Sequence, residues 1–226
     1  MSLTNACIQS NIASVRSELG ALVTAPDFVV ATKYATPDQI RCVIESQIYM
    51  IGENKVQDAA QKKALLQSQS VCMDAVEWHM IGHLQRNKVN KAIHTFDVIQ
   101  SIDSISLLRK LNESLDTAEK TIRGYLQVNI GHDPQKFGFT STDIMSRHAQ
   151  LFEFKNVIIE GIMIVTPQTC HESKRRKLFK KSFDLYTWLQ TIHPSIKTLS
   201  MGMSNDYRLA AEEGATMVRL GQCIFK

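Results

Sequence analysis

The sequence predicts a single-domain α/β protein, a (β/α)8 barrel of the TIM type with an extra N-terminal helix. About eight short apolar runs alternate with longer helical patterns over all 226 residues, which is typical of parallel strands joined by right-handed crossovers. The chain is also close to the roughly 250 residues of such barrels. No linker divides it, and no Gly-x-Gly-x-x-Gly follows the first run, so an open doubly wound sheet is the weaker alternative.

An amphipathic helix opens the chain, because Ile8, Ile12, Val15 and Leu19 recur at helical spacing. The predicted strands, which are short apolar runs, cover residues 28–32, 48–52, 77–82, 97–101, 124–130, 157–165, 197–201 and 216–221. The helical patterns between them cover residues 36–47, 54–67, 85–96, 104–120, 141–152, 171–192 and 204–214. Little sequence follows the last strand, so we expect the N-terminal helix to complete the outer ring.

Composition excludes several classes of protein. A net charge of +4 and a pI near 8.8 fall short of the basic excess of a dedicated nucleic-acid binder. The five cysteines are scattered without a Cys-x-x-Cys pair, which indicates free thiols in a reducing compartment. We find no signal peptide, and the apolar run 157–165 is too short to span a bilayer. We therefore expect a cytoplasmic protein that binds neither nucleic acid nor membrane.

The strongest basic run, residues 172–181, alternates charges with apolar residues such as Leu178 and Phe179. This pattern favours the solvated face of an outer helix over a nucleic-acid patch. His79 and His83 are four residues apart, but Gly82 interrupts them and His79 falls in a predicted strand, so we expect no metal site.

Polar residues follow several predicted strands, and the carboxyl ends of barrel strands converge on one face. The loop after the seventh strand, "SMGMSND", offers Ser200, Gly202, Ser204 and the amides that open the next helix. These groups form a donor set suited to a phosphate. Ser204 is equally suited to cap that helix, and Asn54 either orients a ligand or caps the helix beginning at Lys55.

Lys33 stands at the end of the first predicted strand, in the segment "VVATKYATPDQI". An inward lysine there, beside Val30 and Tyr34, would lose part of its solvation. The neutral amine, which forms Schiff bases with aldehydes, would then be favoured. A strand-end lysine is more often a solvated cation, so this residue alone does not decide the function.

Four segments together resemble the pyridoxal 5'-phosphate (PLP) homeostasis protein family, relatives of the N-terminal barrel of alanine racemase. They are "VATKYATPDQI", "GENKVQDA", "WHMIGHLQRNK" and "LSMGMSNDYRLAAEEGATMVRLGQCIF". The resemblance covers nearly the whole chain and implies one PLP-binding domain over residues 1–226.

The resemblance implies that Lys33 forms the internal aldimine with PLP and that Arg219 faces the pyridine nitrogen. It also implies that the phosphate is lined by Ser200, Gly202, Ser204 and Gly221. An arginine beside the ring disfavours protonation of the ring nitrogen, because two positive charges would lie close together. The PLP ring would then be a weak electron sink, so we expect the protein to bind the cofactor without using it for catalysis.

Two departures from the family pattern concern the site. Phe137 occupies the place of the serine in Lys-Ser-Gly, and Gln222 replaces a small hydroxyl residue after Gly221. The first removes any polar role of that serine, and the second removes a side-chain contact to the phosphate. A third departure, the final "IFK" in place of Ile-Phe-Gly, lies at the chain end.

The function we expect is to hold PLP on Lys33 and to buffer it or deliver it to PLP-dependent apoenzymes. We expect a monomer without a dedicated catalytic activity. The alternative is a weakly active amino-acid racemase, which needs proton-transfer groups on both faces, with Tyr34 and Tyr207 as candidates. A Schiff-base aldolase is a third possibility, with Asp103 or Glu53 as acid or base.

Overall fold

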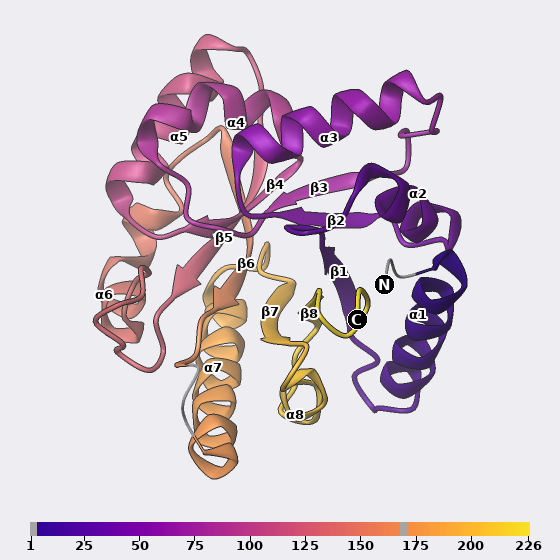
Figure 1. Cartoon of the computed structure of the whole chain (residues 1–226). Coiled ribbons are helices and arrows are strands. Elements are labelled where there is room, and N and C mark those ends of the chain that lie inside the picture. Colours follow the sequence, from indigo (N-terminus) through magenta and orange to yellow (C-terminus); the bar gives the residue numbers. More distant parts are fainter. Residues whose placement is uncertain (1–3, 168–170) are drawn as a thin grey trace.

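The structure, a computed structural model, describes residues 4–167 and 171–226. Eight parallel strands close into one barrel in sequence order, with β8 hydrogen-bonded to β1. Figure 1 shows the barrel surrounded by helices. The strands are β1 (Asp27–Ala31), β2 (Met50–Glu53), β3 (Glu77–Met80), β4 (Val98–Ile102), β5 (Ile122–Val128), β6 (Val157–Ile164), β7 (Thr198–Met203) and β8 (Met217–Leu220).

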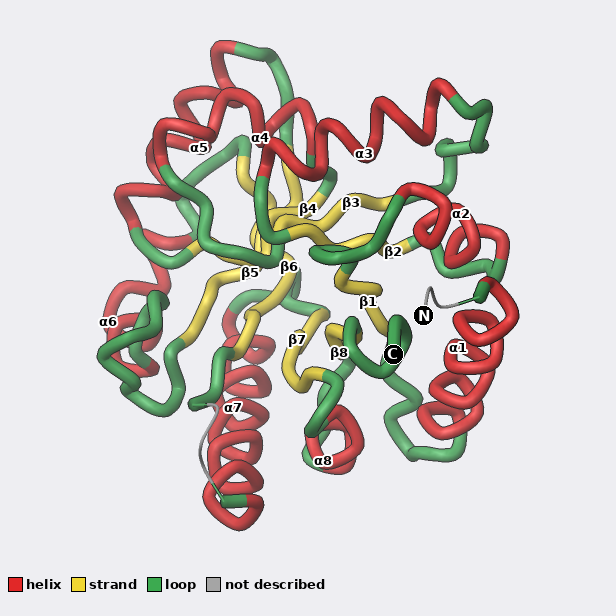
Figure 2. The backbone as a smooth tube through the Cα atoms, viewed as in Figure 1, coloured by secondary structure: helices red, strands yellow, loops and turns green. Residues whose placement is uncertain are grey.

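Helices form the outer layer, as the red segments around the yellow barrel in Figure 2 show. They are α1 (Asn5–Gly20), α2 (Pro37–Glu45), α3 (Val56–Ser68), the 3-10 turn η1 (Arg86–Lys88), α4 (Val89–Thr95), α5 (Ile105–Thr117), α6 (Ser141–Leu151), α7 (Glu172–Ile192) and α8 (Tyr207–Glu212). The predicted fold class and all eight strands are confirmed. The expected helix over residues 85–96 divides into η1 and α4, and α8 is shorter than expected.

The N-terminal helix completes the outer ring, as predicted. Ile8 and Ile12 on its apolar face are buried, and the helix packs against α2. Its Asn11 side-chain amide donates to the carbonyls of Ile224 and Lys226, at 3.0 and 3.1 Å. The first helix and the last residues of the chain are therefore held together.

Alternation along the strands divides the buried side chains into two sets. One set faces the helices and forms the large outer core, with Trp78 and Ile99 fully buried. The other is a smaller apolar cluster inside the barrel, formed by Val29, Val98, Tyr125, Met163 and Met217.

Gly202 in β7 occupies a position that only glycine fits. Its φ is +93°, and a Cβ atom there would lie 2.5 Å from Cβ of Ala210 in α8. We expect Gly202→Ala to destabilise the protein by about 2 kcal/mol or more, through backbone strain and the steric clash. Chemical denaturation measures the change as a lower midpoint.

The matched control is Gly20→Ala in the last turn of α1, where an added Cβ meets nothing within 4 Å. That substitution should change stability by less than about 1 kcal/mol. Adding Ala210→Gly to Gly202→Ala should recover only part of the loss, because the φ strain remains. Equal effects of the two alanines would contradict this reading of β7.

Candidate functional site

The seven residues predicted to bind a cofactor gather at one side of the barrel mouth. They come from four adjacent strands or the turns that follow them, in the order β7, β8, β1 and β2. The pairing of Val29 with Arg219 and of Val30 with Leu220 brings the end of the chain beside the turn that carries Lys33. Barrel closure therefore assembles residues that lie almost 200 positions apart in sequence.

Lys33 lies in the turn between β1 and α2. The predicted Thr-Pro helix start is confirmed: Thr36 and Gln39 form a capping box and Pro37 opens α2. Lys33 is exposed, so the expected desolvation of its amine by Val30 is wrong. Its Nζ lies 4.8 Å from the centroid of the Tyr34 ring. Hydrogen bonding to Lys33 and the positive charge of its amine lower the pKa of Tyr34.

A buried ion pair fixes the backbone just before Lys33. Nζ of Lys62 in α3 donates to Oε1 of Glu53 and to the carbonyl of Thr32, both at 2.6 Å. The Thr32 hydroxyl donates to the same carboxylate oxygen at 2.7 Å. Glu53 is fully buried, so its carboxylate needs these partners, to which the Asn54 amide adds a bond to Oε2 at 3.3 Å. Lys62 was not predicted from the sequence, because a lysine within a helical pattern looks like a solvated residue.

The loop after β7 is joined to the end of β8 by Ser204. Its Oγ accepts from the amides of Gly221 and Cys223, at 3.1 and 3.3 Å. Ser204 therefore does not cap α8: the helix begins at Tyr207 and the cap position belongs to Asp206. Two backbone amides thus converge on one point, an arrangement that suits a phosphate oxygen.

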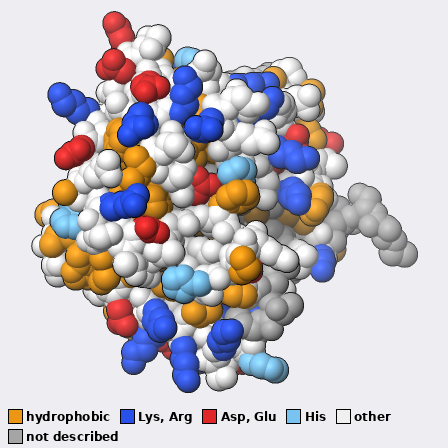
Figure 3. All heavy atoms as spheres, turned by 90° about the vertical axis from the view of Figure 1, so that its left-hand side faces the viewer, with side chains coloured by type: hydrophobic (Ala, Val, Ile, Leu, Met, Phe, Trp, Pro, Cys, Tyr) orange, Lys and Arg blue, Asp and Glu red, His pale blue; other side chains and the backbone are white. Residues whose placement is uncertain are grey.

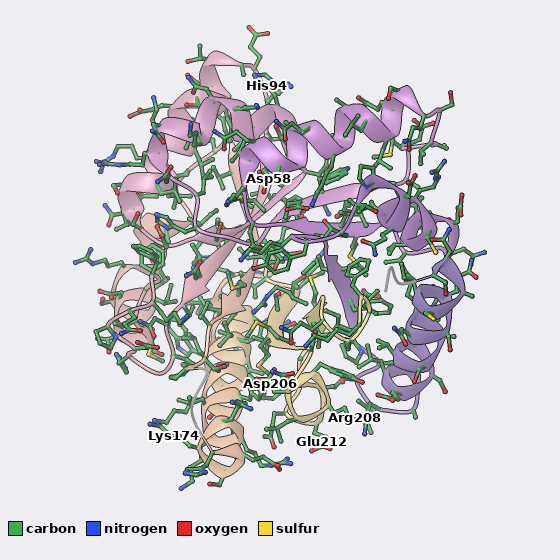
Figure 4. The ribbon with its side chains drawn as sticks, in the orientation of Figure 1. Asp58, His94, Lys174, Asp206, Arg208 and Glu212 are labelled. Atoms are coloured by element: carbon green, nitrogen blue, oxygen red, sulfur yellow. The ribbon has the colours of Figure 1, made fainter. Side chains whose placement is uncertain are left out.

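Asp206 anchors the same loop to the end of β7 and to α7. Its Oδ1 accepts from the Met203 amide at 2.7 Å, and Oδ2 lies 3.3 Å from Nε of Arg175 in α7. Figure 4 places Asp206 between α7 and α8, with Lys174 on the side of α7 away from α8. Arg176 also pairs with Glu212 and Glu213.

The basic run 172–181 is thus an outer helix, as predicted, but two of its arginines bind α8. Leu178 and Phe179 are buried, whereas Lys174, Lys180 and Lys181 are exposed. Lys and Arg side chains gather at the lower edge of Figure 3, at the level of the lower end of α7 in Figure 1.

Arg219 is buried near the barrel mouth, with 8% of its surface exposed. One terminal nitrogen donates to the carbonyl and hydroxyl of Ser200, at 2.8 and 2.7 Å, and the other donates to the Ile164 carbonyl at 2.9 Å. Burial lowers the pKa of Arg219 to about 10, against the opposing attraction of Asp206. The guanidinium therefore stays charged at neutral pH.

The hydroxyl of Ser200 is turned into the barrel interior. It is fully buried and donates to Oε1 of Gln100 at 2.8 Å. Gln100 Nε2 donates in turn to Nδ1 of His79 at 2.9 Å. From the sequence, His79 was a candidate only as a metal ligand, and Gln100 was not predicted to belong to the site.

The hydrogen-bonded series Arg219, Ser200, Gln100 and His79 extends toward the opposite mouth of the barrel. Nε2 of His79 lies 3.2 Å from Oε2 of Glu77, a close contact that falls short of a well-directed hydrogen bond. Arg123 pairs with the same oxygen at 2.7 Å. The nearby His79 N–H, followed by Arg123, lowers the pKa of Glu77 from 4.5 to about 2, although burial opposes the shift.

Asn54 and Gly221 complete the mouth on either side of Lys33. Asn54 directly follows β2, and its backbone lies so close to Gly82 that a Cβ on that glycine would be 2.4 Å from the Asn54 carbonyl oxygen. Asn54 does not cap α3, because the helix begins at Val56 with Lys55 at the cap position. A Cβ on Gly221 would lie 3.0 Å from the Ala31 carbonyl oxygen, so glycine allows β8 to approach β1 closely.

The side of the mouth formed by the loops after β3, β4 and β5 has a different character. A cavity of about 570 Å³ opens there, lined in part by Arg86, Asp103 and Lys136. His83 Nδ1 lies 2.9 Å from Asp103 Oδ2, and the imidazole stacks on Phe137 with centroids 3.9 Å apart. Phe137, a departure from the family pattern, therefore makes a ring contact, whereas Gln222 is simply exposed.

Several other candidates are already engaged by neighbouring side chains. Tyr207 packs under α1 with its hydroxyl bonded to Glu18, so it is not available as a proton-transfer group. Glu53 and Asp103 are engaged by Lys62 and His83. Across residues 4–167 and 171–226, no three His, Cys, Asp or Glu side chains are grouped to hold a metal ion.

Four cysteines, Cys7, Cys42, Cys72 and Cys223, are free thiols, and Cys170 lies outside the described residues. Within the described part of the chain, no helix combines the length and apolar character needed to cross a membrane.

Comparison with known proteins gives a consistent family. The family model described as "Alanine racemase, N-terminal domain" matches residues 7–226. A pyridoxal phosphate homeostasis protein of a Synechocystis strain is 34% identical over 215 residues, which cover 94% of this chain and 96% of that protein. The Escherichia coli K12 protein of the same name is 28% identical, covering 96% of this chain and 95% of its own length.

Solved structures agree with the sequence comparison. PipY of Synechococcus elongatus, solved with PLP bound, is 31% identical with a TM-score of 0.87, covering 97% of this chain and 100% of that chain. Its form without PLP has a TM-score of 0.89 at 32% identity, with the same coverage. An alanine racemase of Clostridium difficile shares the fold at 12% identity, with a TM-score of 0.74, covering 96% of this chain and 55% of its own.

The Glu53–Lys62 pair generates a prediction about stability. Lys62→Met leaves a buried carboxylate without its cation, and we expect a loss of about 3 kcal/mol or more. The double variant Glu53→Gln/Lys62→Met should recover part of that loss, because no buried charge remains. Chemical denaturation of the three proteins measures both effects.

The control is Lys63→Met, one position along α3, where the amine makes a single bond to the Thr95 carbonyl. Its loss should stay below about 1 kcal/mol. Equal stabilities of Lys62→Met and Lys63→Met would show that the Glu53–Lys62 pair contributes no more than the single hydrogen bond of Lys63.

The lowered pKa of Glu77 generates a prediction about acid stability. A carboxylate whose folded pKa is depressed stabilises the fold above its unfolded pKa of 4.5, and this contribution disappears as the pH falls toward about 2. Allowing for the exposed third of the side chain, we expect it to be worth about 1 to 2 kcal/mol. Glu77→Gln should therefore be less stable than the wild type near neutral pH, and the difference should narrow below pH 4.5.

Denaturation midpoints recorded across this pH range give the test. The control is Glu172→Gln, whose carboxylate is 77% exposed and lies 3.8 Å from Arg176. A gap between wild type and Glu77→Gln that stays constant down to about pH 2 would refute the assignment.

Proposed function

The chain belongs to the pyridoxal phosphate homeostasis protein family, and on this premise we propose that it binds PLP as a Schiff base on Lys33. PLP supplies an aldehyde that condenses with a primary amine, together with a phosphate dianion. The cellular function we infer is to buffer PLP and to deliver it while keeping a reactive aldehyde away from other amines. The observation that carries the proposal is the convergence of an exposed amine, two backbone amides and a buried guanidinium on one side of the barrel mouth.

Each residue at this side of the mouth has a chemical role in the proposal. Lys33 is exposed and therefore open to a ligand aldehyde. The amides of Gly221 and Cys223, now paired with Ser204, offer donors to a phosphate oxygen. Gly202 gives β7 a left-handed residue just before the loop that carries Ser204, and Asn54 borders the mouth beside Lys33.

Arg219 determines how far the ring could act as an electron sink. Its bonds to Ser200 and Ile164 use three of the five guanidinium N–H groups. The two N–H groups that remain are able to donate to a pyridine nitrogen, but a guanidinium cannot accept a proton from it. A ring nitrogen held by Arg219 therefore stays unprotonated, and the protein binds PLP without strongly activating it.

The racemase alternative is not favoured. Racemisation needs a proton-transfer group on each face of the bound substrate. Tyr207, one of the two candidates, packs against α1 and is bonded to Glu18. Lys33 becomes free when a substrate amine replaces it on the aldehyde, and Tyr34 is its neighbour in the same turn. With Tyr207 engaged, neither of the two tyrosines is placed to serve the face opposite Lys33. Both acid or base candidates of the aldolase alternative are engaged as well, because Glu53 is tied to Lys62 and Asp103 pairs with His83.

Delivery requires that a recipient reach the bound aldehyde. Lys33 and Tyr34 are both exposed, Tyr34 by 87%, so an incoming amine meets no lid over this turn within the described residues. We propose PLP-dependent apoenzymes as the recipients, with the protein acting as a monomer in the cytoplasm. The four free thiols support a reducing compartment.

The test of the proposal is the absorption spectrum of the purified protein with added PLP. We expect the wild type to develop the yellow band of a PLP Schiff base and to retain it covalently after borohydride reduction, with the label on Lys33. Lys33→Ala should lack both the band and the label.

The matched control is Lys55→Ala, which removes a neighbouring exposed lysine whose charge also acts on Tyr34. This variant should keep the band. An unlabelled wild type, or a band equally lost in both variants, would overturn the role of Lys33. Rapid racemisation of amino acids by the loaded protein would overturn the carrier function.

A further inference from the structure

The polar side chains inside the barrel form one connected row. Arg219, Ser200, Gln100 and His79 are each at least 92% buried, since their exposed fractions are 8% for Arg219 and 0% for the others. They come from β8, β7, β4 and β3, which are not all neighbours in the sheet. The row crosses the barrel interior, whose other members include the apolar Val98 and Met163. Buried polar groups are costly unless paired, so such a row calls for a physical reason.

The direction of every hydrogen bond in the row follows from its first member. A guanidinium only donates, so the Ser200 hydroxyl oxygen accepts from Arg219. The Ser200 proton must then point elsewhere, and the acceptor it reaches is Oε1 of Gln100, at 2.8 Å. This fixes the orientation of the Gln100 amide.

The same logic fixes the tautomer of His79. With Oε1 facing Ser200, the Nε2 group of Gln100 faces His79 and donates to Nδ1. Nδ1 is therefore an acceptor, and the proton of a neutral imidazole lies on Nε2. That N–H faces the carboxylate of Glu77 at 3.2 Å. Glu77 is held in turn by Arg123, so the row ends on an anion as it begins on a cation.

We propose that His79 is a positioning residue for Arg219, acting through Gln100 and Ser200 to hold the guanidinium toward the PLP ring. This inference rests on the proposed function. Gln100 Nε2 has Nδ1 of His79 as its one strong acceptor, because its other contact is the sulfur of Met217 at 3.5 Å. The Nδ1 acceptor therefore keeps the amide from turning over.

Loss of that acceptor acts on Arg219 in two steps. If the Gln100 amide turns over, its Nε2 group faces Ser200 and the hydroxyl loses the acceptor for its proton. Arg219 then keeps its bonds to the carbonyls of Ser200 and Ile164 but loses a defined hydroxyl partner. The guanidinium is left less restricted, and its remaining donors are no longer aimed in one direction.

A first measurement needs neither a variant nor PLP. Nitrogen-15 NMR of histidine-labelled wild type distinguishes the two neutral tautomers by the shifts of the ring nitrogens. We expect His79 with its proton on Nε2 and Nδ1 as the acceptor. A His79 ring protonated on Nδ1 at neutral pH would overturn the proposal, whether or not the protein binds PLP.

The second measurement compares two substitutions at His79. His79→Asn keeps an oxygen acceptor near the place of Nδ1, whereas His79→Leu removes it. With nitrogen-15 labelled PLP, the pyridine nitrogen shift reports the hydrogen bond from Arg219. We expect His79→Leu to move that shift toward the value of an unbonded acceptor and to raise the PLP dissociation constant about threefold to tenfold, the effect of one hydrogen bond. His79→Asn should stay close to the wild type.

A double-mutant cycle separates positioning from general damage to the core. Ser200→Ala removes the next member of the row and should give the same pyridine shift as His79→Leu. The double variant should bind PLP no more weakly than the worse single variant, because both act through one path. Independent, additive losses, or an unchanged pyridine shift in His79→Leu, would refute the positioning role.

The two proposals fail in different ways. If the wild type does not bind PLP, the proposed function fails while the tautomer measurement still decides the state of the row. If the wild type binds PLP on Lys33 and His79→Leu leaves the pyridine shift unmoved, only the role of His79 is lost.

Discussion

The hydrogen bonding of β1 to β8 is the constraint on which the rest of this structure depends. It pairs Asp27 with Met217 at one end of the strands and Val30 with Leu220 at the other. Without it, Lys33 and Arg219 would lie at opposite edges of an open sheet. Closure also removes both free edges, which would otherwise present unpaired backbone groups to other chains. Glycine at position 221 permits the close approach of the two strands at the mouth.

Closure also explains why the barrel interior tolerates so much polarity. An open sheet would expose His79 and Gln100 to water, where they would need no partner. Inside the barrel a polar group needs a fixed partner. The row supplies hydrogen bonds from Arg219 to His79 and ends in the close contact of His79 with Glu77. The buried Glu53–Lys62 pair follows the same principle on the outside of the barrel wall. Charged side chains are thus buried on both sides of the barrel wall near the turn that carries Lys33: Arg219 on the inside and the Glu53–Lys62 pair on the outside.

Much of this architecture could be predicted from the sequence. The strands follow short apolar runs and the helices follow apolar residues at helical spacing, so Ile8 and Trp78 reveal their environments through local pattern. Once a barrel is assumed, the same pattern places Lys33 at a strand end and a segment suited to bind a phosphate around Gly202. Alternation tells which side of a strand a residue faces, because successive side chains point in opposite directions.

The remaining features depend on three-dimensional register. Gln100 meets His79 from 21 residues away and Ser200 from 100 residues away, and no local pattern signals either contact. Ser204 looked like a helix cap, but the short α8 begins three residues later and leaves its hydroxyl to the β8 amides. Lys33 proved exposed because the turn before α2 projects it beyond the strand. Depth within the fold is a property of packing, which periodicity does not encode.

The position of α1 has a consequence for the order in which the protein is made. This helix is the first described element to leave the ribosome, yet its Asn11 binds the carbonyls of Ile224 and Lys226, which follow β8. Its other anchor, Glu18, binds Tyr207 and Arg208 of α8. The nascent chain therefore carries Lys33 long before β8 exists to stand beside it, and contacts this distant form late. Arg219 and the β8 amides join the amine only after β8 has been translated, so a chain that stops before β8 has a lysine but no pocket.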